Sequence, residues 1–146
     1  MDTKLKSILY SSVSDYLTVD RIYTCLIKSR INLYIIFNGK YVYDKYTTRE
    51  DIQERDRYLV FICSVIISSK LYMDHSYTNE SWTGVSHIPC VYISRVERKI
   101  LEGIDYDIKI PYRNMEKMYE EYHSTPKTTT STSRGLRGIL KLIFCM

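Results

Sequence analysis

The fold of this 146-residue chain is decided by the stretch RYLVFICSVIISSKLYM at residues 57–73. Its apolar side chains recur at i, i+3, i+4, i+7 and i+8, the spacing of one helix face, and they are Leu59, Ile62, Cys63, Ile66 and Ile67. At about 100° per residue, Lys70 falls near the middle of this stripe. The pattern therefore predicts a long buried helix that carries a charge on its apolar face.

A second helical pattern downstream repeats the anomaly. Its apolar positions are Ile93, Val96, Ile100, Leu101 and Ile104, and Glu97 falls among them. Burying either charge alone would cost several kcal/mol, so each needs a partner or a route to water. We expect the two helices to pack side by side, with Lys70 and Glu97 meeting at their rim where a partner protein contacts them. The alternative is that Lys70 extends along its own stem to solvent while Glu97 leans outward.

The composition favours one all-α domain. A chain of 146 residues can bury one adequate core, and only five glycines and three prolines argue against a turn-rich β fold. The four cysteines lie far apart with no CxxC pair, so neither a zinc site nor a disulfide framework is indicated, and a reducing intracellular compartment is expected. No signal peptide is expected at the start, and the longest apolar stretch, residues 59–67, is too short to span a bilayer.

The net charge of +4 comes from the end of the chain. All 17 acidic residues lie within residues 1–123. The charged residues among the last 23 are all basic, namely Lys127, Arg134, Arg137 and Lys141. The rest of the chain is therefore balanced and lacks the basic excess of a nucleic-acid-binding domain. We expect an N-terminal arm at 1–17 with a frayed start, a folded domain at 18–123, and a disordered tail at 124–146. That tail is a Ser/Thr-rich linker with a basic, apolar end.

The remaining helices follow from capping and periodicity. Thr18 is expected to cap the first, and a second, at about 33–46, contains Gly39 at a cost of about 1 kcal/mol relative to alanine. Its β-branched and aromatic residues make a strand a competing interpretation. Thr48 is expected to open the third element, which ends near Met73, and Thr78 to cap a fourth. A fifth runs from about Val91 to 103 or 104, and a last one contains residues 115–122.

No catalytic or cofactor-binding motif is present. The chain has neither a GxxxxGK[ST] nor a GxGxxG sequence, so we expect it to bind no nucleotide phosphate and no cofactor. His75 follows Asp74 without a nucleophile or an orienting group nearby, which favours a solvated loop pair over a catalytic dyad. The sequence predicts a protein that is not an enzyme.

Three motifs resemble those of the cyclin box, and specifically of the single-box PHO-type (P/U-type) cyclins. The sequences are SSKLYMD at 68–74, YTNESW at 77–82 and VERKILEGI at 96–104. They are similar to the family's ASKFLDD, YTNxxW and LERxFL motifs, in the same order and at the expected separations. The resemblance implies a five-helix box, with short flanking helices here, that activates a cyclin-dependent kinase.

In that family the third-helix lysine and fifth-helix glutamate grip the regulatory helix of the kinase, and Lys70 and Glu97 match them. The family's acidic pair after the lysine is half present, because Met73 replaces its first member and Asp74 keeps the second. Aromatic residues near the lysine are further candidates for the docking surface, namely Tyr72, Tyr77 and Trp82. The predicted kinase-binding residues are Lys70, Glu97, Asp74, Tyr72 and Trp82.

The resemblance thus implies a regulatory subunit that binds and activates a PHO-pathway type cyclin-dependent kinase, in the nucleus, the cytoplasm or both. It names neither the individual kinase nor its substrates, and both cell-cycle and phosphate-signalling roles stay open. The alternative is a cyclin-box transcription-factor module that binds nucleic acid, although such proteins usually carry two boxes and basic surfaces. A membrane contact by 134–146 could coexist with kinase binding. No homo-oligomer is expected.

Overall fold

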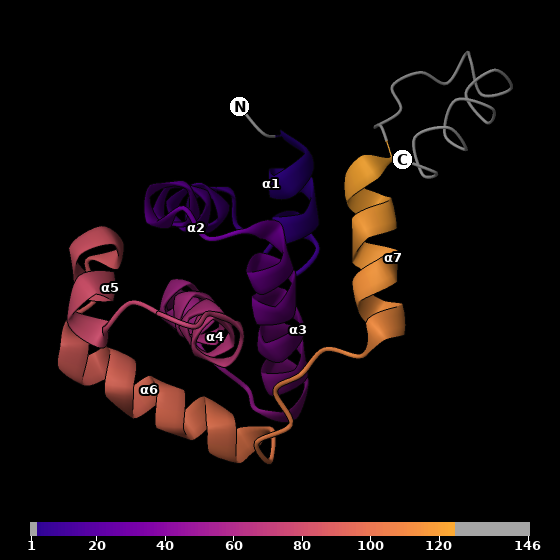
Figure 1. Ribbon diagram of the computed structural model, residues 1–146. Coiled ribbons are helices and arrows are strands. Elements are labelled where there is room, and N and C mark those ends of the chain that lie inside the picture. Colours follow the sequence, from indigo (N-terminus) through magenta and orange to yellow (C-terminus); the bar gives the residue numbers. More distant parts are fainter. Residues whose placement is uncertain (1–2, 125–146) are drawn as a thin grey trace, which may run out of the picture.

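The computed structural model describes residues 3–124, which are all-helical as predicted and contain no strand (Figure 1). The seven α-helices are α1 (Thr3–Tyr10), α2 (Tyr16–Ser29), α3 (Leu33–Arg49), α4 (Arg57–Tyr72), α5 (Asn79–Ser86), α6 (Cys90–Gly103) and α7 (Tyr112–His123). A 3-10 turn, η1 (Glu54–Asp56), precedes α4. Helices α2–α6 form the predicted series of five, and α1 and α7 flank them.

Helix α4 lies at the centre of the molecule (Figure 1). It packs against α2, α3 and α6, and its residues 60–69 are all buried. A helix that is apolar on every side is typical of such a central position. The long apolar run read from the sequence therefore builds the middle of the core, and Lys70 comes directly after its last buried residue.

Gly39 lies where α3 crosses α4. A Cβ at this position would lie 2.6 Å from Cγ2 of Val65 and 2.9 Å from its Cα. Only a glycine allows the two helices to approach this closely. The residue that looks like a defect in a helical sequence is thus required by packing, and the segment is a helix rather than a strand.

Two predicted helix starts are wrong. The cap of α2 is Asp15, whose carboxylate accepts hydrogen bonds from the backbone N–H of Thr18 (2.9 Å) and from its hydroxyl. Asp15 thus satisfies the free N–H groups of the first turn, and Thr18 lies inside the helix. Thr48 belongs to the end of α3, and α4 begins only at Arg57. The Thr78 cap of α5 is confirmed, since its side chain accepts from Ser81 N at 3.1 Å.

The expectation of a frayed start to the N-terminal arm is also wrong for the residues described there, from Thr3 onward. Helix α1 buries Leu5, Ile8 and Leu9. Lys6 forms an ion pair with Asp20 of α2 at 2.9 Å, and α1 also packs against α7. A short polar sequence is thus ordered by three apolar side chains at helical spacing.

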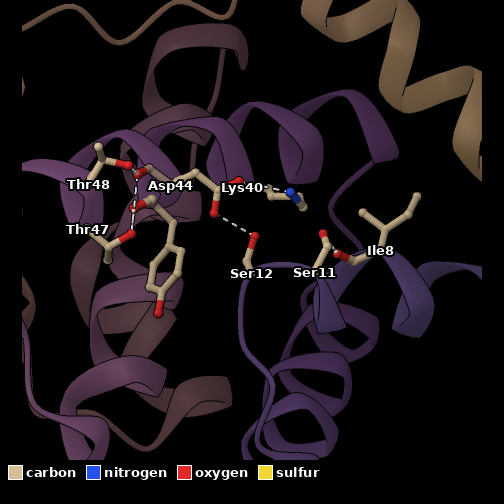
Figure 2. Close-up of polar contacts among 8 residues, drawn as sticks. Ile8, Ser11, Ser12, Lys40, Asp44, Thr47 and Thr48 are labelled. Carbon is tan, nitrogen blue, oxygen red and sulfur yellow. Dashed lines mark hydrogen bonds and ion pairs between the residues drawn. The ribbon is translucent and has the colours of Figure 1, made fainter.

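The segment after α1 is fastened to α3 (Figure 2). Ser12 donates to one oxygen of Asp44 at 2.6 Å, and Lys40 pairs with the other at 2.9 Å. Lys40 is only 9% exposed, so the carboxylate compensates a nearly buried ammonium group. Figure 2 also shows Thr47 and Thr48 bonded to backbone carbonyls of the preceding turn.

The predicted boundaries of the folded domain, between residues 17 and 18 and between residues 123 and 124, stay predictions.

The predictions for the Ser/Thr-rich linker and the basic tail lie outside the described residues, apart from Ser124. Within residues 3–124, no helix is long and apolar enough to cross a membrane.

Candidate partner-binding surface

The two anomalous charges form an ion pair between α4 and α6. Lys70 Nζ lies 3.0 Å from Oε2 of Glu97 and 3.1 Å from Oε1. The lysine side chain is 40% exposed, whereas that of the glutamate is 11% exposed. The predicted pairing at the rim is confirmed, and the lysine is the member that solvent reaches.

Asn79, the first residue of α5, holds the buried glutamate in place. Its Nδ2 donates to Glu97 Oε1 at 3.0 Å and to Ser94 Oγ at 3.1 Å. A carboxylate that accepts from both an ammonium and an amide has the compensation that burial requires. Asn79 was not among the predicted site residues, although it stands in the YTNESW motif directly after the Thr78 cap.

The environment behind the ion pair is apolar and electrically neutral. Cys63 is fully buried, and burial, together with the nearby Glu97 charge, raises the pKa of its thiol well above the usual range. The thiol therefore stays protonated and packs as an apolar side chain. The negative charge of Glu97 is therefore compensated only from the rim side, by Lys70 and Asn79.

An apolar groove adjoins the ion pair. It encloses about 350 Å³ and is lined by Ile67, Lys70, Leu71, Glu97, Leu101 and Ile108. Leu71 is 43% exposed there. A concave apolar surface with a charged edge is typical of a site that receives side chains of a partner.

Asn38 of α3 anchors Ile108, one of the residues that line this groove. It is fully buried, and its Nδ2 donates to Ser68 Oγ (2.7 Å) and to the carbonyl of Ile108 (3.0 Å). Its Oδ1 accepts from the backbone N–H of Ile110 at 2.8 Å. One amide thus fastens the segment after α6 to both α3 and α4. The helical periodicity gave no signal for it.

The other predicted site residues occupy different environments. Tyr72 is half-buried, stacks edge-on against Tyr34 with ring centroids 5.0 Å apart, and donates to Asn38 Oδ1 at 3.3 Å. Asp74 is exposed in the loop after α4. The side chain of Trp82 is fully buried, so we assign it a packing role and leave it out of the contact surface. Kinase contacts by Lys70, Glu97, Asp74 and Tyr72 stay predictions.

Tyr77 is exposed and donates to the carbonyl of Ser29 at 3.0 Å, which ties the loop before α5 to the end of α2. Residues 3–124 contain no group of three or more His, Cys, Asp or Glu side chains that could hold a metal ion. The surface offers shape, apolar contact and a charge pair, and these are the properties of a binding site.

The comparisons with known proteins bear on the same region. The family model described as "Cyclin, N-terminal domain" matches residues 15–109, which include α2–α6 and therefore Lys70, Asn79 and Glu97. The match covers more than half of the chain. No curated protein and no solved structure gives a significant match.

Proposed function

The chain belongs to the cyclin family, and we propose that it is the regulatory subunit of a cyclin-dependent protein kinase, which it binds and activates through the groove between α4 and α6. Proteins of this family are in general regulatory and non-catalytic. The observation that carries the proposal is the Lys70–Glu97 pair at the edge of an apolar groove. These are the positions at which the family grips its kinase.

The mechanism is a shift of population in the kinase. The apolar walls, Leu71 and Leu101, receive side chains of the mobile helix of the kinase, and Lys70 bonds to groups at the end of that helix. Activity requires that helix in its inward position, where the kinase completes its own lysine–glutamate pair and metal site. A cyclin that binds only the inward position stabilises it by the difference in affinity.

The burial of Glu97 makes it a positioning residue in this mechanism. Its carboxylate is occupied by Lys70 and Asn79, so it orients the ammonium group of Lys70 toward the groove. The exposed donors of Lys70 remain for backbone carbonyls or a carboxylate of the kinase. The proposal therefore assigns direct contact to Lys70, Leu71 and Leu101.

The motif similarity in residues 68–104 supports the PHO-type subfamily, and we include this subfamily in the proposal, with a site of action in the nucleus, the cytoplasm or both. The Ser68–Asp74 and Tyr77–Trp82 stretches are the residues that carry it. A PHO-pathway kinase is accordingly the first partner to test.

The test uses the full chain and purified cyclin-dependent kinases, with phosphorylation of a peptide substrate as the readout. We expect activation of a PHO-type kinase by the wild-type chain, and at least a tenfold loss with Leu71→Asp. The matched control is Tyr112→Asp, which places the same charge on an apolar residue of α7 that is 80% exposed and does not line the groove. Equal activation by both variants, or none by the wild-type chain with any such kinase, would contradict the proposal.

A further inference from the structure

A second cleft separates the N-terminal part of α7 from the C-terminal part of α3, two helices that lie side by side (Figure 1). It encloses about 390 Å³, its α3 wall lies within residues 41–49, and its α7 wall consists of Asn114 and Met118. It shares no lining residue with the groove beside Lys70. Binding pockets have volumes of about 300–1,000 Å³, so the cleft has room for more than one side chain.

Helix α7 is anchored by its C-terminal part. Tyr119 and Tyr122 lie edge-on against Phe37 of α3, with ring centroids 4.9 and 6.0 Å away. Met115 is the one buried residue of α7, and Met118 beside the cleft is half-buried. A helix of this length is marginally stable in water without packing. Apolar contacts made in the cleft would therefore stabilise the N-terminal part of α7.

The charges in the lining of this cleft are already compensated. The charged residues there are Asp44, Lys45 and Arg49, and each forms an ion pair with a residue outside the lining. Between them lie the Tyr41 ring and the Met118 side chain. An occupant therefore needs no charge of its own inside the cleft, and apolar side chains fit it best.

An acidic residue extends the α7 wall toward the C-terminus of the helix. Glu121 follows Met118 by three residues and so lies next to it on the same face of α7. It is exposed and forms no ion pair with any residue in 3–124. A basic occupant of the cleft would find an uncompensated carboxylate there.

The end of the chain carries an apolar stripe like those of the core helices. Its apolar residues recur at i, i+3, i+4, i+7 and i+8, and they are Leu136, Ile139, Leu140, Ile143 and Phe144. Arg137 and Lys141 fall beside the stripe, and residues 124–146 contain no acidic residue. Such a stripe needs an apolar surface to pack against. Residues 135–146 therefore match the cleft in apolar character and Glu121 in charge.

The length of the chain allows this segment to reach the cleft. The helical rise of 1.5 Å per residue places Met118 about 9 Å and Asn114 about 15 Å from Ser124, the last residue before the linker. The linker at 125–134 has ten residues, and a flexible chain of that length spans about 16–19 Å on average. The segment at 135–146 can therefore return along α7 to the cleft without stretching the linker.

We propose that residues 135–146 dock in the cleft between α3 and α7 as an amphipathic helix. The apolar stripe packs against Tyr41 and Met118, and a cation of the segment pairs with Glu121. The Ser/Thr-rich linker serves as the tether, so the disorder expected of the tail is limited to residues 125–134. The groove beside Lys70 fits this segment less well, because Lys70 is 40% exposed there and repels a basic segment.

The proposal does not depend on kinase activation, because the two sites share no lining residue and the test needs no kinase. The test is photo-cross-linking in the full chain, with benzoylphenylalanine in place of Asn114 in the cleft. The matched control carries it in place of Glu116, which is two residues away on α7, about 200° around the helix, and outside the lining. We expect the yield of cross-links to residues 135–146 to be at least fivefold higher from position 114 than from position 116.

Paired variants identify the contacts. Ile139→Asp places a charge on the stripe and is expected to lower the cross-linking yield at least fivefold, whereas Leu142→Asp, off the stripe, should change it less than twofold. Glu121→Lys should lower the yield at least twofold, and more than Glu120→Lys, which makes the same change off the cleft face of α7. Thermal melts without the probe give a second measurement. Ile139→Asp should lower Tm by about 2 °C or more, and Leu142→Asp should leave it unchanged.

Several results would overturn the proposal. They are equal cross-linking from positions 114 and 116, no cross-link to residues 135–146, or equal effects of Ile139→Asp and Leu142→Asp. Cross-links that join two chains, seen as a covalent dimer on a gel, would replace the chain's own segment with that of a second copy. Equal cross-linking, together with binding of the full chain to phosphatidylserine vesicles that Ile139→Asp abolishes, would assign the stripe to a membrane surface.

Discussion

Alanine substitution of two glycines should change stability in opposite directions. At Gly39 the added Cβ would lie 2.6 Å from a methyl carbon of Val65 and 2.9 Å from its Cα, so α3 and α4 must separate. At Gly84 in α5 no atom lies within 4 Å of the added Cβ. The two substitutions make the same chemical change, at a buried helix position without space for the Cβ and at an exposed one with space for it.

The magnitudes follow from these distances. Overpacking of a core contact costs about 1–3 kcal/mol, and Gly39→Ala belongs to the upper part of this range, at about 2–3 kcal/mol, because the added Cβ meets a backbone atom of Val65 that cannot swing aside. About 1 kcal/mol of this cost is recovered by the better helix propensity of alanine. We therefore expect Gly39→Ala to lower the free energy of unfolding by about 1–2 kcal/mol. Gly84→Ala should raise it by about 0.5–1 kcal/mol, since it gains the propensity without a clash.

The assay is urea unfolding followed by circular dichroism, with thermal melts as a second measurement. At about 3–5 °C per kcal/mol for a domain of this size, Tm should fall by about 3–10 °C for Gly39→Ala and rise by about 2–5 °C for Gly84→Ala. An increase in stability for both variants would refute the reasoning, because it would mean that α3 and α4 do not approach each other at Gly39.

Three further predictions concern single side chains. Asn79→Asp should lower Tm, because a carboxylate would replace the amide donor that faces Glu97. This holds although an acid at a helix start is normally favourable. An unchanged or higher Tm in thermal melts would contradict the contact between Asn79 and Glu97. The hydrogen bonds from Thr18 lower the pKa of Asp15 below its usual value of 3.8, so the stability that they contribute is present above that value and is lost as the pH falls through the lowered pKa. The difference in unfolding free energy between the wild type and Asp15→Asn should therefore shrink from about pH 5 to about pH 2, and a difference independent of pH would contradict this. Cys25, buried and with its thiol pKa raised to about 11, should resist iodoacetamide at pH 8 in the native chain and react in urea; peptide mass spectrometry checks this, and rapid native labelling would contradict it.

The sequence predicts those parts of the structure that depend on periodicity. The central helix, the Glu97 helix and the meeting of Lys70 with Glu97 follow from apolar spacing, because a charge inside such a stripe can be accommodated in few ways. The positions of Lys70 and Glu97 within apolar helix faces therefore predict the candidate site from the sequence alone. The all-α class followed from the same patterns.

Other parts depend on contacts between residues distant in sequence. Asn38 forms hydrogen bonds with Ser68, 30 positions later, and with Ile110, 72 positions later. No feature of the sequence around Asn38 marks it as a buried anchor. The same holds for Gly39. A glycine is required there because Val65 of α4 lies directly opposite, and the sequence alone does not show that contact. The Asp15 cap was missed because Thr18, three residues later, offered an equally good capping side chain. Local patterns identify elements, whereas tertiary contacts decide their ends and anchors.

The central claim is that Lys70, held in place by Glu97, presents a positive charge that the kinase recognises. Exchanging both charges, Lys70→Glu with Glu97→Lys, tests it directly. Each single reversal places like charges at the rim and should destabilise the fold, while the exchange restores an ion pair of opposite sense. Asn79 can accommodate the exchange, because its Oδ1 is buried without a hydrogen-bond partner and can accept from the new ammonium group after the amide turns over.

The measurement is kinase activation by the doubly exchanged chain, made beside a thermal melt of the same sample. We predict a Tm near that of the wild type and activation reduced at least tenfold, because the donors and acceptors of the kinase keep their original positions. A doubly exchanged chain that is stably folded and activates the kinase as the wild type does would contradict the claim. Lys70 and Glu97 would then serve only to hold α4 against α6.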